Sequence, residues 1–499
     1  MSDSAATVSV ADAGERHTNR WVVLVLVCMA QFMVVLDSTI VNVALPAIQH
    51  DLHFTVDSLQ WVVNAYTLVL GGFLLLGGRA GDLFGRKRLF LIGVAIFTLA
   101  SLMNALGTTA GMLILFRGVQ GFGAALISPI ALSIVTTTFT DGRERAKALA
   151  VWAAIAVGGA SIGLIIGGAL TEYLSWRWNF FINIPVGIAV IAVAWRLLPT
   201  MAPTTSKGLR GFDVGGAVTA TAGLMSIVYG IVGANQYGWT DARTLGFMAG
   251  GVALLVVFVV IESRVADPLV RLGIFRVRTL RAADLTMLIV SGGMFSVFFF
   301  ASLYVQEVLG FSPLRAGLGF LPLTAAIIFS AGLAQRVIGP LGIKMTALIG
   351  LTTAAIGLAI LTTISAQGSY TTEVLPGLVV MGLGLGLTFM PLTMLATYGT
   401  DAHDAGLASG LLNASQQVGG ALGLAILSTL AAHMTTSHLD SLGHAPSHLD
   451  TVTAAVSGYH AAFIAGAALM ALGAVLLALM INSREARVDQ VAVPIPIDG

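Results

Sequence analysis

The chain has 499 residues, of which 57% are hydrophobic and 10% are charged. Soluble domains carry about a quarter of charged residues, so one long soluble core is excluded. The net charge is +1, and the sequence shows no basic pattern typical of proteins that bind nucleic acids. Apolar runs of the length that a membrane-spanning helix needs, about 20 residues, recur along nearly the whole chain, whereas the alternation of a membrane β-barrel is absent. The composition therefore predicts an all-α polytopic membrane protein.

Apolar runs bounded by charges, by Gly and Pro turns or by polar clusters predict about fourteen spans. The expected spans lie near residues 21–45, 58–78, 88–107, 112–135, 147–170, 178–198, 213–233, 244–263, 281–304, 316–336, 342–364, 373–397, 407–430 and 459–481. The first run lacks the short apolar core and small-residue cleavage site of a secretory signal. We therefore expect it to be an uncleaved anchor.

The basic residues indicate which segments face the cytoplasm. With the N-terminus inside, 21 of the 25 lysines and arginines fall in cytoplasmic segments, and Arg117 falls inside a span. The outer segments receive Arg177, Arg243 and Arg315. This asymmetry predicts a multi-pass protein of the cytoplasmic (inner) membrane with both termini in the cytoplasm.

The most basic stretch, from Arg264 to Arg281, divides the chain. We expect a cytoplasmic tail at 1–20, a six-helix bundle at 21–198, a linker with two additional spans at 199–280, a second six-helix bundle at 281–481 and a cytoplasmic tail at 482–499. The stretch 336–344 is a weak copy of the stretch 78–88, and each follows the second helix of its bundle. The two bundles are therefore expected to form an internal repeat.

Cysteine and histidine give no support for a metal site, and we expect no cofactor. Cys28 is the only cysteine, which excludes an intramolecular disulfide and a multi-cysteine cluster. His433, His438, His444 and His448 lie between the last two spans without regular ligand spacing. We expect them in a solvated outer loop.

Arg117 lies inside the fourth span. An arginine there costs about 2.5–3.5 kcal/mol against lipid, so its side chain should face a polar cavity or a partner. Gln120, Gly121, Ala124 and Ser128 share its face at helical spacing. The alternative is that Arg117 extends its side chain to the nearby outer membrane surface.

Asp37 is the buried charge of the first span, and it borders a polar face formed by Gln31, Ser38 and Asn42. A rise of 1.5 Å per residue places Asp37 and Arg117 in the outer half of the membrane, at comparable depth. We predict that the two interact and that Asp37 exchanges a proton or a cationic substrate for this contact. The alternative is a static ion pair that fixes helix register.

Glycines mark two further segments. In the fifth span, Gly159, Gly163 and Gly167 repeat on one face and Gly168 follows, which permits close helix packing and a bend. Packing alone accounts for this pattern, so a hinge does not follow from it.

The stretch 78–88 combines glycines with one acid and four bases, and we expect a tight cytoplasmic turn. Asp82 could pair with Arg143 or Arg145, or with a helix N-terminus, in one conformation and separate in another. The alternative is an ordinary basic loop. The residues of this conformational loop are Gly78, Asp82, Gly85, Arg86 and Lys87.

These segments together resemble the major facilitator superfamily, and more narrowly its fourteen-span drug:proton antiporter family of multidrug and antibiotic exporters. The matching positions are the conformational loop, Arg117 with Gln120 and Gly121, the first-span run 36–46 and the segment 176–187. The resemblance covers most of residues 20–430 and implies a role for Arg117 in proton transfer. One departure is Leu164, which stands where the family has proline after the central glycine.

The resemblance implies two six-helix bundles, with two extra helices inserted between them, that open alternately to either side. It implies a monomeric secondary transporter that exports lipophilic drugs or antibiotics, cationic ones included, in exchange for protons. The candidate cavity residues are Asn42, Asn64, Tyr66, Gln120, Phe295, Phe298, Phe299, Met390, Asn413 and Gln417.

Two other classes of function compete with drug export. A proton-coupled importer or exporter of an endogenous small metabolite would share the fold and the buried charges. A membrane enzyme is disfavoured, because the sequence contains no phosphate loop, no paired metal-ligand motif and no nucleophile constellation.

Overall fold

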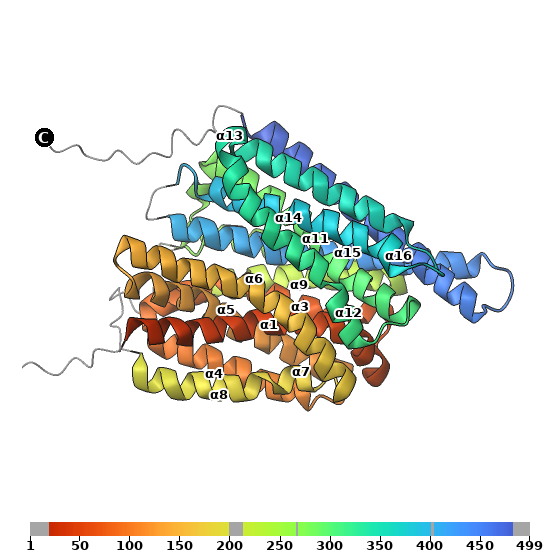
Figure 1. Ribbon diagram of the computed structural model, residues 1–499, viewed down its shortest axis with the longest axis horizontal. Helices are drawn as coiled ribbons and strands as arrows, with labels where there is room; N and C mark the ends of the chain where they lie inside the picture. The colour runs from red at the N-terminus through yellow and green to blue at the C-terminus, as the bar shows by residue number, and fades with distance from the viewer. Residues whose placement is uncertain (1–18, 199–212, 266–267, 401–403, 483–499) are drawn as a thin grey trace, which may run out of the picture.

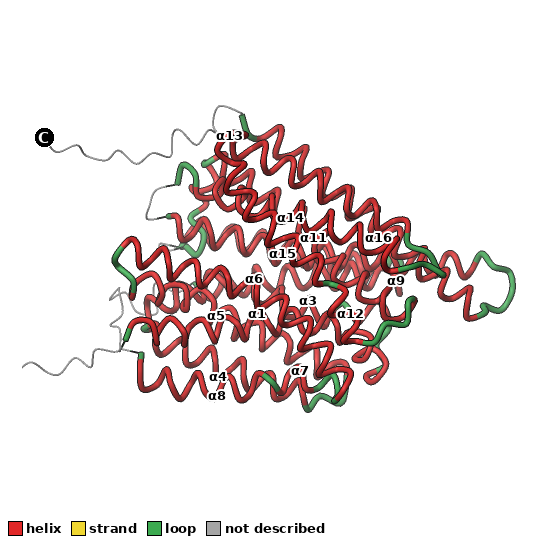
Figure 2. Tube along the Cα trace, in the orientation of Figure 1, coloured by secondary structure: helices red, strands yellow, loops and turns green. Residues whose placement is uncertain are grey.

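The computed structural model describes residues 19–198, 213–265, 268–400 and 404–482. Within these ranges the chain is helical and has no strand (Figure 2). Twelve helical segments of this part are long and apolar enough to cross a membrane. The predicted tails at 1–20 and 482–499 lie almost entirely outside the described residues, and so do residues 199–212 of the predicted linker.

The helices of the N-terminal half pack against one another (Figure 1, red to yellow). They are α1 (Arg20–Leu52), α2 (Val56–Leu59), α3 (Trp61–Phe84), α4 (Arg86–Ala105), α5 (Ala110–Thr138), α6 (Gly142–Tyr173), α7 (Trp178–Phe181) and α8 (Asn183–Leu197). α1 contacts α5, α6 and α8, while α5 also contacts α3 and α4. This arrangement puts α1 and α5 side by side, so the first and fourth predicted spans face each other.

The C-terminal half forms a second group of helices (Figure 1, green to blue). Its elements are η2 (Leu272–Arg276), α11 (Arg278–Leu303), η3 (Tyr304–Val308), α12 (Pro313–Gly319), α13 (Leu321–Ile360), η4 (Leu361–Thr363), η5 (Tyr370–Val374), α14 (Leu375–Thr397), α15 (Ala405–Asp440) and α16 (His448–Met480). α11 contacts α14, α15 and α16, and α13 contacts α14 and α16.

Two helices lie between the halves in the sequence, α9 (Val214–Tyr237) and α10 (Ala242–Arg264). α9 packs against α3 of the first half and α15 of the second. α10 packs against α9, and only 11% of its most apolar stretch is buried. An apolar helix with so little burial is suited to contact with lipid.

The number of spans differs from the expected fourteen because of two helices. α13 is 40 residues long, but Gly342 within it has non-helical angles (φ 81°, ψ 162°), so two helices meet there. α6 is 32 residues long and is not among the twelve candidate spans. The count of fourteen stays a prediction.

Two lysines make corresponding contacts in the two halves, which is what an internal repeat would predict. Lys87 follows Gly85 (φ 93°) by two residues, and its ammonium group donates to the carbonyls of Trp195 (2.8 Å) and Leu198 (2.6 Å), where α8 ends. In the second half, Lys344 follows Gly342 by two residues and donates to the carbonyls of Ala478 (2.9 Å) and Ile481 (2.5 Å), where α16 ends. In each half, therefore, a positive-φ glycine starts the third helix and a lysine caps the sixth.

The tight turn expected in the stretch 78–88 is confined to Gly85. α3 continues through Gly78 and Gly81 to Phe84, and Gly85 alone breaks the helix before α4 begins. A Cβ atom at Gly81 would lie 2.8 Å from Ile130 of α5, and one at Gly78 would lie 3.4 Å from Pro129. These two glycines allow α3 and α5 to pack closely, so they serve helix packing and not a turn.

The expected solvated loop between the last two spans is mostly helical. α15 continues to Asp440 and α16 begins at His448, so the connection has only the residues between them. Figure 1 shows this helical hairpin extending beyond the other helices. A sequence reading based on apolar runs ends helices too early where polar helical turns leave the membrane.

The two halves contact each other along α3 and α15, and also near the C-terminal parts of α1, α6 and α11. The Ser302 hydroxyl donates to the Asn42 carbonyl (2.8 Å), and the Gln306 amide donates to the Val43 carbonyl (3.1 Å). The backbone N–H of Leu314 in α12 donates to Glu172 of α6 (3.0 Å). Toward the other end, α13 diverges from the helices of the first half (Figure 1), whereas α15 stays in contact with α3. We call these three contacts the outer closure, following the predicted orientation.

Candidate functional site

Asp37 of α1 and Arg117 of α5 form the predicted ion pair. Nη1 of Arg117 lies 2.6 Å from Oδ2 of Asp37, and the side chains are 1% and 0% exposed. Since neither side chain reaches the surface, the alternative in which Arg117 extends to the outer interface does not describe this structure. The two charges compensate each other inside the protein.

Uncharged side chains complete the surroundings of the Asp37 carboxylate. Its Oδ1 accepts hydrogen bonds from Gln120 Nε2 (2.7 Å) and Asn183 Nδ2 (2.8 Å). Ser101 of α4 accepts from both amides, at 2.7 Å and 3.3 Å, and Asn104 donates to Gln120 Oε1 (2.9 Å). We call this set the polar cluster: Asp37, Ser101, Asn104, Arg117, Gln120 and Asn183. It joins α1, α4, α5 and α8.

Arg117 is held by partners besides Asp37. Its Nε donates to the carbonyl of Val62 in α3 (2.9 Å), and Nη1 also donates to Gln120 Oε1 (2.8 Å). The guanidinium carbon lies 4.3 Å from the centre of the Tyr66 ring, which favours a cation–π contact. These neutral partners would keep the guanidinium in place if Asp37 lost its charge.

Sequence reasoning missed three members of the polar cluster: Ser101, Asn104 and Asn183. Each is a neutral polar residue inside a predicted span, and each is at most 1% exposed. Their position inside apolar spans is the signal that the sequence offers, since buried polar groups need hydrogen-bond partners. The sequence does not show which helix faces these residues occupy. Oδ1 atoms of Asn104 and Asn183 have no hydrogen-bond partner among the described residues, so they can accept from water.

The candidate cavity residues of the N-terminal half are largely enclosed. Asn64 and Tyr66 are 0% and 1% exposed, and Asn64 donates to Gln60 (3.3 Å). Asn42 is partly buried, and its carbonyl belongs to the outer closure. In this conformation Tyr66 supports Arg117, and its role in a substrate cavity stays a prediction.

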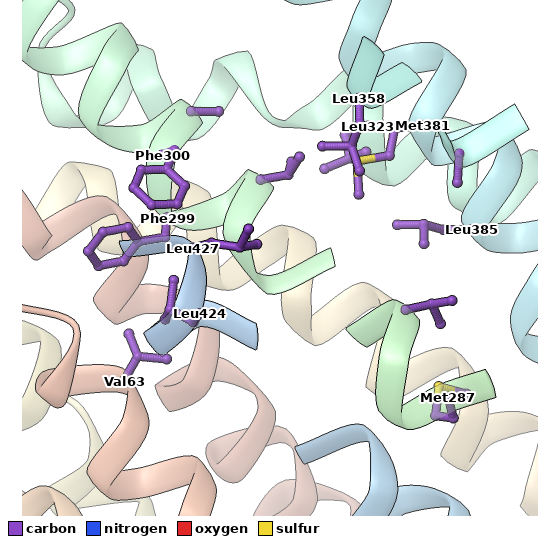
Figure 3. Packing of buried hydrophobic residues seen from close by; sticks show 14 of the residues in the cluster. Val63, Met287, Phe299, Phe300, Leu323, Leu358, Met381, Leu385, Leu424 and Leu427 are labelled. Atoms are coloured by element: carbon purple, nitrogen blue, oxygen red, sulfur yellow. The ribbon is translucent and has the colours of Figure 1, made fainter. Parts of the chain in front are cut away.

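The candidates of the C-terminal half differ in exposure. Phe299 is fully buried and packs edge-on against Phe300 at 5.1 Å, within the apolar core (Figure 3). Asn413 is exposed. The partly buried candidates are Phe295, Phe298, Met390 and Gln417. Partly buried side chains are the ones a substrate could reach here, and their role as lining residues stays a prediction.

The glycines of α6 bring two other helices close. A Cβ atom at Gly159 would lie 3.2 Å from Phe32 of α1, and one at Gly167 would lie 2.5 Å from Ile40 of α1. Gly163 abuts Thr39 on the same helix, whereas Gly168 faces the backbone of Pro313 in α12. The face therefore packs α6 on α1 and on the second half, and a hinge at these glycines stays a prediction.

The conformational loop is tied to neighbouring segments by its bases. Arg79 donates from Nη1 to the carbonyl of Pro268 (2.6 Å), at the start of the segment that leads to α11. Lys87 caps α8, as described above. The side chain of Asp82 lies outside the described part of the structure, so its pairing with Arg143 or Arg145 stays a prediction.

Comparison with known proteins gives agreement at the level of sequence and fold. The sequence pattern of the Major Facilitator Superfamily matches residues 27–424. The puromycin resistance protein pur8 of Streptomyces alboniger is 39% identical, over 98% of this chain and 96% of its own. The cephamycin export protein CmcT of Amycolatopsis lactamdurans is 40% identical, over 83% of this chain and 85% of its own. The solved nucleoside transporter NupG superposes with a TM-score of 0.64 at 12% identity, covering 93% of this chain and 100% of its own, which shows similarity of fold alone.

Proposed function

We propose, from the premise that the chain belongs to the Major Facilitator Superfamily, that it exports lipophilic antibiotics or drugs across the cytoplasmic membrane in exchange for protons. The family makes it a multi-pass membrane transporter and not an enzyme. Relatives across its length are antibiotic resistance and export proteins, which favours export over uptake. The observation that carries the proton coupling is the buried ion pair of Asp37 and Arg117.

A proton on Asp37 changes the balance of the polar cluster. The ionised carboxylate accepts from Arg117, Gln120 and Asn183, and its charge is matched by the guanidinium. A neutral carboxyl group would lose the attraction to Arg117, whereas Arg117 would keep its contacts to Val62 and Gln120. Protonation therefore loosens α1 from α5 without releasing the arginine into an apolar region.

α1 connects this proton site to the outer closure. Asn42 and Val43, whose carbonyls accept from Ser302 and Gln306, follow Asp37 by five and six residues, about 8–9 Å along the helix. A shift of α1 that accompanies protonation would therefore move one side of the closure. This connection couples proton binding to the exchange between inward-open and outward-open states.

The partly buried aromatic side chains of α11 suit a lipophilic substrate. Phe295 and Phe298 lie on the face of α11 that leads to Ser302, and the Phe298 ring stacks on Phe320 at 5.8 Å. An apolar, aromatic wall with few polar groups binds different lipophilic molecules with loose specificity. We assign the substrate class from this wall and from the relatives, whose names mention puromycin and cephamycin.

Drug accumulation in an efflux-deficient host tests the function. Cells that express the wild type should accumulate less of at least one compound in a panel that includes puromycin and a cephamycin, and a protonophore should abolish the difference. The Asp37→Asn variant should lose it too, while Asp51→Asn, on the exposed end of the same helix, should retain it. If the wild type changed the accumulation of no compound, drug export would be wrong. If Asp37→Asn exported normally, its role in coupling would be wrong.

A further inference from the structure

Asp284 is a second buried acid, and it lies far from the polar cluster. It belongs to α11, is 5% exposed, and neither of its carboxylate oxygens has a hydrogen-bond partner among the described residues. Asp37, by contrast, accepts three hydrogen bonds from side chains. A buried carboxylate without a partner is costly when ionised, so such a residue in a membrane protein is rarely retained for structure alone.

The position of Asp284 on α11 connects it with the proposed transport path. Residues that follow Asp284 by four, seven, eleven, fourteen or eighteen positions lie on the same face of the helix. This face carries Leu288, Ser291, Phe295, Phe298 and Ser302. Ser302 contacts α1 of the other half, while Leu288 and Phe295 pack against α15, the helix that contacts α3 of the other half. Asp284 therefore lies on the same face as two candidate cavity residues, nearer to the predicted cytoplasmic end.

Asp284 and Asp37 lie at different depths in the predicted membrane. Asp284 follows the first residue of α11, Arg278, by six residues, about 9 Å, whereas Asp37 follows the first residue of α1 by seventeen, about 25 Å. Both helices start on the predicted cytoplasmic side. One acid thus lies near the cytoplasmic end of the boundary between the halves and the other lies near its outer end.

No counter-charge faces Asp284 in the described structure. Its own helix and η2 contribute Arg276, Arg278 and Arg281, which are all exposed. α14 contributes no charged group. On the other elements packed against α11, the ionisable groups lie toward the predicted outer end or many residues away from the depth of Asp284, and Arg20 lies at the start of α1. These groups are His433, His438 and Asp440 on α15; His448, Asp450, Tyr459 and His460 on α16; Tyr304 and Glu307 on η3; and Cys28, Asp37, His50 and Asp51 on α1.

We propose that Asp284 is a second proton-binding site of the transport cycle, on the cytoplasmic half of the boundary between the halves. The carboxyl group is stable in its buried position when it carries a proton, and it releases the proton when the cycle exposes it to water. This proposal rests on the proposed proton-coupled export, and it adds a proton to the one assigned to Asp37.

The number of protons moved per drug molecule tests this proposal. The purified protein is reconstituted into liposomes with a trapped pH dye, and drug and proton fluxes are measured together. Asp284→Asn should move fewer protons per drug than the wild type while it still exchanges labelled for unlabelled drug. Asp284→Glu should restore the wild-type ratio, and Ser291→Ala, on the same face, should leave it unchanged.

An equal ratio for Asp284→Asn and the wild type would overturn the assignment. Absence of proton movement in the wild type itself would instead overturn the proposed function. If Asp284→Asn does not fold, the wild-type protein still gives an answer. Dicyclohexylcarbodiimide modifies protonated carboxyl groups in apolar surroundings, so mass spectrometry should find it on Asp284, with less modification as the pH rises. No modification at any pH would contradict the proposal.

Discussion

Three side chains stabilise the negative charge of the Asp37 carboxylate in different ways. Arg117 supplies the counter-charge, while Gln120 and Asn183 supply hydrogen-bond donors that do not depend on charge. The guanidinium also bonds the backbone of α3 through a different nitrogen, Nε. Arginine contacts these two acceptors with separate nitrogens of one planar group, whereas a lysine would have to place its single nitrogen near both.

Arg117→Lys should therefore reduce transport although the charge is conserved. The ammonium group can reach Asp37 or the Val62 carbonyl but cannot reproduce the forked contact. We expect drug export to fall by roughly tenfold or more, which corresponds to about 1.4 kcal/mol in a barrier. Efflux from preloaded vesicles measures this loss, with Arg243→Lys on the exposed start of α10 as the control. Export at the wild-type rate would show that charge alone matters.

The ion pair and the nearby Gln120 could be predicted from the sequence, but the other three members of the polar cluster could not. A charge inside a span must find a partner, and helix rise gives its depth, so Asp37 and Arg117 identify each other. Asn183 and Ser101 carry no charge, and neutral polar residues occur on many helix faces. Only the packing of α4 and α8 on α5 and α1 decides which of them reach the carboxylate.

At the scale of helices, glycines explain most of the close contacts. Gly78 and Gly81 look like turn residues in the sequence, but they lie in α3 and admit side chains of α5. In contrast, Gly85 and Gly342 have positive φ and do break the chain. A sequence shows that a glycine is present, whereas the backbone angle that separates packing from turning depends on the neighbouring helix.

The lysine caps should contribute equally in the two halves. Lys87 and Lys344 each donate two hydrogen bonds to carbonyls at a helix end, and hydrogen bonds of charged groups contribute about 1.5–3 kcal/mol when buried, less at a wet surface. Lys87→Met and Lys344→Met should both lower the unfolding temperature of the purified protein. The exposed Arg88→Met should not. A loss in one half alone would contradict the equivalence of the two caps.

The contact of α6 with α12 should control the outer closure. The Leu164 carbonyl lies against Gly317, at the position where the resembling family has proline, and α6 is continuous there. A valine at Gly317 would clash with this carbonyl and separate the helices.

Gly317→Val should therefore open the outer closure. In a Cys28→Ala background, a thiol introduced by Ser302→Cys should react faster with a membrane-impermeant reagent added outside. Gly332→Val, at a glycine with open space around it, is the control. Unchanged reactivity would show that this contact does not hold the closure.

At the scale of the whole molecule, the two halves contact each other at the outer closure and along α3 and α15, while α13 diverges from the first half at the opposite end (Figure 1). Each half has a positive-φ glycine followed by a lysine that caps its last long helix. Two helix bundles that are each packed internally and that meet along a limited boundary can move as units. Of the two inserted helices, α9 packs against α3 of the first half and α15 of the second, and α10 packs on α9 at the periphery.

Binding of a transported drug should bring the diverging ends together. Spin labels introduced by Arg143→Cys on α6 and Arg336→Cys on α13, in the Cys28→Ala background, report the distance between the halves. Double electron–electron resonance should show a long distance between the two labels without drug. With drug, a population with a shorter distance should appear and grow. A second pair, Arg143→Cys with Arg88→Cys, lies within one half and should not change. Equal changes in both pairs would contradict movement of the halves as units.

If the Asp37 carboxylate couples proton flow to drug movement, a pH gradient must be able to drive the drug against a concentration difference. Liposomes that hold the protein with its cytoplasmic side outward, under an imposed pH gradient, allow this accumulation to be measured. We predict that the wild type concentrates drug inside while Asp37→Asn does not, although the variant still binds the drug. Accumulation by Asp37→Asn at the wild-type level would contradict the account.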